Sequence, residues 1–394
     1  MKRIFLPLLF SMIPLAAAAD DKGVWRVFVA DATTPAVEVF DIATGSRLDR
    51  FSLTSPARVY AGDSGAFVYA VQGEADRVSA IATGFSFEDH GDHADMEVAA
   101  PALVGDILSG TTPVHFVPHG DDIAVFFDGE GVTRVFSDQA VGKGDLAVQT
   151  YASARPHHGV ASAFGDVVLI SEPVKDSDAA LPDWVRAVTA DGTQVGAPHD
   201  CPGLHGEAGS GKLMAFGCSD GILVFSPGTE GPVSKHFAYP AELGEGRTGA
   251  LRGTEAYEMF VGNYGANKLL LIDPSAEEPF RSVEFAGPQI GFELDPARPK
   301  FGYALGFDGT LSEIDLLGGV ITRTLPVTGP YSTEGGHGAV RPALAVAGET
   351  IIVSDPEAAS LHLIAAESFT ASGAIALEGK PASIAAVGGI PASH

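Results

Sequence analysis

The chain has few basic residues and, beyond its N-terminus, no long apolar run. Lys and Arg number 24 against 50 Asp and Glu, which gives a formal net charge of −26. Contacts to a phosphate backbone need clustered Lys and Arg, so nucleic acid is disfavoured as a partner. No later segment reaches about 20 uninterrupted apolar residues, so no membrane-spanning helix is expected. The negative field favours solubility and raises the local concentration of cations.

Several chemistry-bearing motifs are also absent. The sequence contains no Gly-x-Ser-x-Gly nucleophile turn, no phosphate loop, no dinucleotide fingerprint and no Cys-x-x-Cys-His haem motif. There are only two cysteines, Cys201 and Cys218. In an oxidising compartment such a pair within one repeat unit predicts a disulfide. Zinc ligation is the alternative, because Cys201 precedes His205 by only four residues.

The first 19 residues predict a secretory signal peptide. Lys2 and Arg3 are followed by an apolar stretch, residues 4–15, and by the small residues 16–19. This order of basic, apolar and small residues is typical of an exported chain. We therefore expect a mature chain, residues 20–394, that is soluble in a bacterial periplasm and does not insert into the membrane.

Turns and short apolar runs dominate the rest of the chain. Gly 48 and Pro 26 accompany repeated Val/Ile/Phe runs, which favours an all-β fold. Units of about 40 to 50 residues with several short strands are typical of a β-propeller. The predicted innermost strands begin near Pro56, His115, His158, His205, Thr248, Gly291, Pro342 and Pro381. The sequence thus predicts a single propeller domain of eight blades, with seven as the alternative, closed by pairing of the N- and C-terminal strands.

Three histidines occupy the same point of successive units. His115, His158 and His205 are 43 and 47 residues apart, and each precedes an apolar strand by eight or nine residues. Equivalent positions on adjacent blades converge on the central channel. Three imidazoles at one mouth of the channel would suit Zn²⁺, which binds imidazole nitrogen, usually with four ligands. The alternative for each single histidine is a structural role.

The fourth ligand and the register of the repeat remain open. Water or a carboxylate could complete the site, and His337, His157 and Glu207 are candidates within the chain. His-Gly dipeptides would align His119, not His115, with the other two histidines. We prefer His115 because its distance to the following strand matches that of the others.

An insertion at residues 85–112 contains an acidic, histidine-rich tract. Two imidazoles, His90 and His93, lie among carboxylates that include Glu88 and Asp92. This composition predicts a flexible metal-binding loop, with a solvated acidic loop as the alternative. Binding there should be weaker than on strands, because the loop must be ordered first.

Taken together, the leader, the propeller repeat, the acidic histidine loop and the His-Gly positions resemble the AztD family of periplasmic zinc metallochaperones. The resemblance covers essentially the whole mature chain. It implies a propeller that binds Zn²⁺ and passes it directly to the solute-binding protein of a zinc ABC importer. We expect a monomer that is not an enzyme. Carried over to this sequence, it places strand-borne ligands at His115, His158 and His205, and transfer-loop ligands at His90 and His93.

Two other functions compete with this interpretation. Some propellers hold a metal that activates water for lactone or phosphoester hydrolysis, and Glu207 or Glu293 could act as the general base. Alternatively, the propeller could be a scaffold for protein partners that binds no metal.

Overall fold

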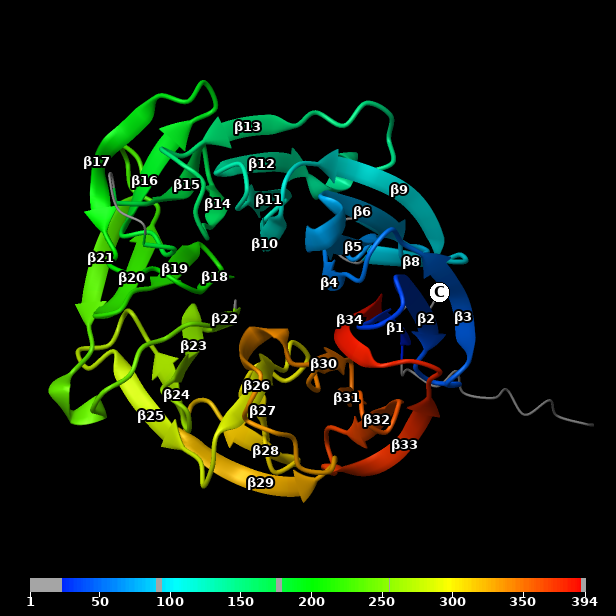
Figure 1. The fold of residues 1–394 in the computed structure, drawn as a ribbon. Coiled ribbons are helices and arrows are strands. Elements are labelled where there is room, and N and C mark those ends of the chain that lie inside the picture. The colour runs from blue at the N-terminus through cyan, green and yellow to red at the C-terminus, as the bar shows by residue number, and fades with distance from the viewer. Residues whose placement is uncertain (1–22, 90–93, 175–178, 255, 391–394) are drawn as a thin grey trace, which may run out of the picture.

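Eight four-stranded antiparallel sheets surround a central channel in the computed structural model, which describes residues 23–89, 94–174, 179–254 and 256–390 (Figure 1). The predicted eight-bladed all-β propeller is therefore confirmed, and the alternative of seven blades is wrong. Within these ranges no helix has the length and apolar character needed to cross a membrane.

Each blade repeats the same order of strands from the channel outward. The innermost strands are β34 (Pro381–Gly389), β4 (Arg58–Ala61), β10 (Pro113–His119), β14 (Ala161–Phe164), β18 (Glu207–Ser210), β22 (Leu251–Thr254), β26 (Gln289–Leu294) and β30 (Leu344–Ala347). The second strands are β1 (Val24–Asp31), β5 (Phe67–Gln72), β11 (Asp122–Phe127), β15 (Val167–Glu172), β19 (Leu213–Gly217), β23 (Met259–Tyr264), β27 (Phe301–Gly306) and β31 (Thr350–Asp355).

The third strands are β2 (Ala36–Asp41), β6 (Arg77–Ala82), β12 (Val132–Ser137), β16 (Trp184–Thr189), β20 (Gly221–Ser226), β24 (Lys268–Ile272), β28 (Thr310–Asp315) and β32 (Ser360–Ala365). The outermost are β3 (Arg47–Ser52), β9 (Ala102–Ser109), β13 (Gln149–Ala152), β17 (Gln194–Asp200), β21 (Val233–Ala238), β25 (Phe280–Glu284), β29 (Val320–Pro326) and β33 (Thr370–Ala376). Short 3₁₀ turns are η1 (Gly73–Ala75), η2 (Asp138–Ala140), η3 (Ala241–Leu243) and η4 (Gly336–Gly338).

The last strand of the chain closes the ring. β34 pairs antiparallel with β1, from Val24 opposite Gly389 to Asp31 opposite Pro381. One blade is thus built from both ends of the described chain (Figure 1). The predicted closure is confirmed, and its effect is to cover strand edges that an open ring would leave unpaired.

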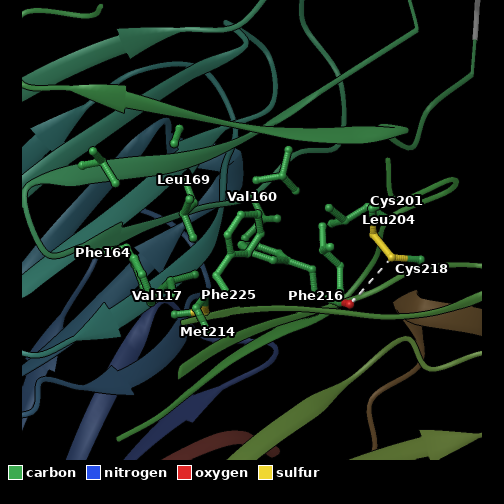
Figure 2. Close-up of a cluster of buried hydrophobic side chains, with 14 residues drawn as sticks. Val117, Val160, Phe164, Leu169, Cys201, Leu204, Met214, Phe216, Cys218 and Phe225 are labelled. Carbon is green, nitrogen blue, oxygen red and sulfur yellow. Dashed lines mark hydrogen bonds between the residues drawn. A yellow bond between two sulfur atoms is a disulfide. The ribbon is translucent and has the colours of Figure 1, made fainter. Parts of the chain in front are cut away.

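Apolar side chains fill the space between neighbouring blades. One cluster includes Leu169, Phe216 and Phe225, each fully buried (Figure 2). At its margin Cys201 and Cys218 form a disulfide, as predicted. The bonded sulfurs have no thiolate to offer a metal, so the alternative of zinc ligation by these cysteines is wrong.

The insertion at residues 85–112 differs from the predicted loop. Its first part is a hairpin of β7 (Phe85–Asp89) and β8 (Ala94–Val98), and its last part, β9, is the outermost strand of the second blade. Sequence pattern alone missed β9 because few of its side chains are buried. Pairing with β6 holds it in place.

The β7–β8 hairpin lies at one particular end of the channel. It joins the third and fourth strands of its blade, so it emerges where the innermost strands end. In agreement, a Cβ placed on Gly389, the last residue of β34, would contact Phe87 and Met96 of the hairpin. His90, Asp92 and His93, at residues 90–93, lie outside the described residues.

Candidate metal centre

Three histidine rings from adjacent blades meet at the opposite mouth of the channel, where the innermost strands begin. His115 is in β10, while His158 and His205 lie just before β14 and β18. Their ring centroids are 4.9 Å apart for His115 and His158, 5.3 Å for His158 and His205, and 6.1 Å for His115 and His205. The register that selects His115 therefore brings the three imidazoles into one small space.

Two of the ring nitrogens already have the spacing of metal ligands. Nε2 of His115 lies 3.3 Å from Nε2 of His158. Zinc–imidazole bonds of about 2.0–2.1 Å at a tetrahedral angle put two ligand nitrogens about 3.3–3.4 Å apart. The pair thus matches one edge of a tetrahedral site, and the donor type is one that Zn²⁺ accepts.

The other nitrogen of each ring is fixed by a hydrogen bond. Nδ1 of His115 is 3.0 Å from Glu207 Oε1, Nδ1 of His158 is 2.6 Å from Asp128 Oδ2, and Nδ1 of His205 is 2.7 Å from the Gly249 carbonyl. Carboxylates and carbonyls only accept, so Nδ1 donates in every case. In the neutral ring Nε2 then carries the lone pair, which is the form that binds a metal.

The walls of the site are glycine and apolar side chains. Gly159, Val160, Leu204 and Gly206 surround the three rings. A Cβ on Gly159 would collide with the ring of Phe126, and a Cβ on Gly206 would meet the backbone of Gly249. These close approaches explain two of the His-Gly dipeptides, because only glycine lets the chain pass so near to its neighbours.

Charge is distributed unevenly around the rings. Burial alone would lower the pKa of His115, but the Glu207 carboxylate outweighs it and the pKa is raised. Burial opposes ionisation of Glu207 as well, yet the His115 ring keeps the pKa of that carboxyl below its usual value. For His205, burial and the two neighbouring imidazoles lower the pKa.

His119 and His157, two of the sequence candidates, lie elsewhere. His119, at the far end of β10, bonds the Ala163 carbonyl through Nδ1 at 2.8 Å, and its ring stacks on Phe164. His157 is buried and uses both nitrogens, with the Arg155 carbonyl at 3.0 Å and Ser171 Oγ at 3.2 Å. These contacts are structural, and neither ring belongs to the three-histidine cluster.

His337 and Glu88 stay predictions as metal ligands. His337 lies in η4, ahead of β30, and Glu88 lies in β7 of the hairpin at the other end of the channel. Glu207, considered above as a fourth ligand, contacts the edge of His115 that faces away from Nε2.

Sequence reasoning missed Asp128 and Gly249, which hold two of the three rings. Neither residue belongs to a recognisable motif. Each of them lies in one blade and contacts a histidine ring of another blade. A weak signal existed for Asp128, since a carboxylate directly follows the buried strand β11.

A second grouping, on the outside of the ring, is not an available metal site. Cys218, Asp220 and His236 offer atoms close to one another, but the Cys218 sulfur is bonded to Cys201. What remains is a contact of 3.1 Å between His236 and Asp220.

Fold and site together define an eight-bladed propeller with an imidazole cluster at one mouth of its channel. No protein-family model matches the chain. It is 39% identical over 384 residues to the zinc chaperone AztD of Citrobacter koseri, which covers 98% of this chain and 91% of that protein. A crystal structure of C. koseri AztD matches with a TM-score of 0.91, covering 94% of this chain and 100% of that one. The chain belongs to the AztD family, and the resemblance noted in its sequence is confirmed.

The structure of apo AztD from the same organism matches with a TM-score of 0.90 at 38% identity, over 94% of this chain and 100% of that one. The dihydro-heme d1 dehydrogenase NirN matches with a TM-score of 0.61 at 14% identity, over 94% of this chain and 76% of that one. At that identity the likeness to NirN concerns the fold alone.

Proposed function

We propose that this protein is a zinc metallochaperone that binds Zn²⁺ through Nε2 of His115, His158 and His205. The observation that carries the proposal is the separation of 3.3 Å between Nε2 of His115 and Nε2 of His158, the edge of a tetrahedral zinc site. Membership of the AztD family supports the same cargo, since the relative from C. koseri is named a zinc chaperone.

The second part of the proposal concerns delivery. A site with three protein ligands keeps one coordination position for water or for an incoming ligand of an acceptor. At the mouth of a channel, that position could be approached by a partner protein. We infer that the acceptor is the solute-binding protein of a zinc ABC importer and that transfer takes place in the periplasm, in keeping with the leader-like residues 1–19. The loop histidines His90 and His93 remain predicted auxiliary ligands.

Hydrolysis is less well supported than delivery. The carboxylates that could have served as general bases are both engaged, Glu207 with His115 at 3.0 Å and Glu293 with Arg252 at 3.1 Å. A scaffold that binds no metal would leave the clustering of three imidazoles without a purpose. We therefore propose a binding and transfer protein with no catalytic residues.

Zinc titration against a competing chelator tests the binding site. The variant with His115, His158 and His205 all changed to alanine should lose tight binding. A matched control removes three imidazoles elsewhere, His119, His199 and His236, and should bind as the unaltered protein does. Equal zinc affinity of the two triple variants would contradict the proposed site, and loss of binding only in the control would favour the His119 register.

Transfer is tested by mixing the zinc-loaded protein with an apo zinc solute-binding protein while a chelator is present in excess. Direct hand-over should deliver zinc to the acceptor faster than the chelator captures it. If zinc reaches the acceptor only at the rate of spontaneous release, the chaperone role is wrong even though zinc binding stands.

A further inference from the structure

We propose that Glu207 and Asp128 are positioning residues that set the zinc affinity of the cluster without touching the metal. The proposal rests on the zinc-binding function proposed above and deepens it. Each carboxylate contacts Nδ1 of its histidine, on the ring edge opposite Nε2, the proposed ligand atom.

Glu207 reaches across the channel mouth to His115. It is the first residue of β18, two positions after His205, whereas His115 lies two blades away in β10. The contact from Glu207 Oε1 to His115 Nδ1 is 3.0 Å, and both side chains are largely buried, with 13% and 17% exposed. The short segment of residues 205–207 therefore supplies both a cluster histidine, His205, and the carboxylate that holds the ring of His115.

Asp128 holds His158 from the neighbouring blade. It follows β11 directly, and its Oδ2 is 2.6 Å from Nδ1 of His158. Its other oxygen, Oδ1, accepts from the backbone N–H of Gly159 at 3.4 Å. Because the same carboxylate contacts the ring and the backbone beside it, both the rotation and the position of the His158 imidazole are constrained.

Oε1 of Glu207 and Oδ2 of Asp128 face away from an ion bound at Nε2 of the ring that each one contacts. Nδ1 and Nε2 lie on opposite sides of an imidazole ring, so an oxygen bonded to Nδ1 faces away from a metal at Nε2. What the two carboxylates supply is orientation, a fixed tautomer and negative charge. Three neutral imidazoles leave the charge of Zn²⁺ uncompensated, and two nearby carboxylates balance it. Loss of such a partner typically weakens metal affinity about 10- to 100-fold.

The test replaces each carboxylate with its amide, Glu207→Gln and Asp128→Asn, and measures zinc affinity by chelator competition. Either change should weaken binding about 10- to 100-fold. The absorption spectrum of the Co²⁺-loaded protein should stay that of a four-coordinate site, because the ligand nitrogens remain. Asp220→Asn is the matched control, since it removes a carboxylate 3.1 Å from His236, outside the cluster, and should leave affinity unchanged.

Nuclear magnetic resonance of the ring nitrogens separates positioning from a general structural effect. In Glu207→Gln the amide can donate as well as accept, so the proton of His115 should no longer be confined to Nδ1, while the His158 ring keeps its tautomer. Asp128→Asn should show the converse. If one variant does not fold, the other variant still tests the inference, because Glu207 and Asp128 contact different histidine rings.

Two results would overturn this inference. One is zinc affinity within about twofold of the unaltered protein in both amide variants while the three-histidine variant has lost binding; the proposed function would then survive alone. The other is a change in the Co²⁺ spectrum that marks a lost ligand, which would make Glu207 or Asp128 a direct ligand. If the three-histidine variant still bound zinc, the proposed function itself would fail.

Discussion

Cys201 is bonded to Cys218 at the base of the segment that presents His205 to the channel. Between the disulfide and the ring, the N–H of Leu204 bonds the Pro182 carbonyl at 2.8 Å, and the N–H of His205 bonds the Gly217 carbonyl at 2.9 Å. The backbone just before and at one cluster histidine is thus held by a covalent bond and by hydrogen bonds to two neighbouring blades, that of β14–β17 and that of β18–β21.

Removal of this disulfide should destabilise the fold and loosen the His205 segment. The closed loop spans a sequence separation of 17 residues. In the chain-entropy model a loop of this size contributes about 3 kcal/mol. We expect the variant with both cysteines changed to serine to unfold at a lower temperature and to bind zinc more weakly. Calorimetry and chelator competition measure the two effects, and an unchanged unfolding temperature would contradict the stabilising role.

A close approach of two innermost strands gives a second prediction. Gly253 in β22 faces the Gly209 carbonyl of β18, and a Cβ on Gly253 would collide with that oxygen. The backbone must move to relieve the clash, so Gly253→Ala should cost about 1–3 kcal/mol. Gly287→Ala is the control, since nothing lies within 4 Å of the added Cβ. Chemical denaturation of the Gly253→Ala and Gly287→Ala variants measures the difference in stability. Equal stability of the two variants would mean that β18 and β22 can move apart at no cost.

The blades were predictable from sequence because each one is local. The sequence pattern of one blade, an apolar second strand such as β11 followed by a third strand of alternating polarity and a turn, lies in one contiguous stretch of about 40 residues. Ring closure was predictable for a related reason. The final strand, β34, lacked partners that follow it in the chain, and the first strand, β1, lacked a preceding innermost strand.

The partners of the cluster histidines were harder to predict. The repeat marks equivalent positions and so brought out His115, His158 and His205. Glu207 holds a ring two blades away, and Asp128 holds a ring on the next blade, so no short spacing connects either carboxylate with its histidine. Only the closed ring decides which side chains face one another across the channel. Strand β9 escaped prediction for a different reason, since its exposed side chains lack an apolar pattern.

Acid should weaken the fold through Asp355. This carboxylate is buried, accepts from the Tyr331 hydroxyl at 2.6 Å and from the N–H of Ala358 at 2.9 Å, and lies 3.2 Å from Nε2 of His362. Burial opposes ionisation, but these partners keep the pKa of Asp355 below its ordinary value. Because the pKa of Asp355 is lower in the folded protein than in the unfolded chain, the ionised carboxylate stabilises the fold at every pH above the unfolded-state pKa of about 3.9. That contribution is lost as the pH falls from there through the folded pKa.

Asp355→Asn should therefore cost about 1–3 kcal/mol at neutral pH. As the pH falls from about 4 through the lowered folded pKa, the difference from the unaltered protein should shrink, because first the unfolded and then the native carboxyl becomes protonated. Urea unfolding at pH 7 and at pH 3 measures both effects. A difference that is constant over this range would show that the carboxylate charge contributes nothing to stability.

Loss of the closing strand should open the ring. Without residues 381–394, strand β1 becomes an unpaired edge and β4 loses its neighbour at the closing blade. Exposed edges pair with other chains, so the truncated protein should associate and unfold more readily. Size-exclusion chromatography reports the association. A synthetic peptide with the sequence of residues 381–389 should restore the elution volume of the unaltered protein by strand addition, whereas a peptide with the same composition in scrambled order should not.

Zinc should stabilise the folded protein through the three-histidine cluster. A ligand that binds only the folded state adds about 2.7 kcal/mol when its free concentration is 100 times Kd. The unfolding temperature of the unaltered protein should therefore rise by several degrees with zinc. The variant that lacks His115, His158 and His205 should show no such rise, while the control that lacks His119, His199 and His236 should respond fully. Scanning calorimetry at matched free zinc makes the comparison. An equal rise in both variants would mean that the stabilising zinc binds elsewhere, because neither set of histidines would then be needed for it.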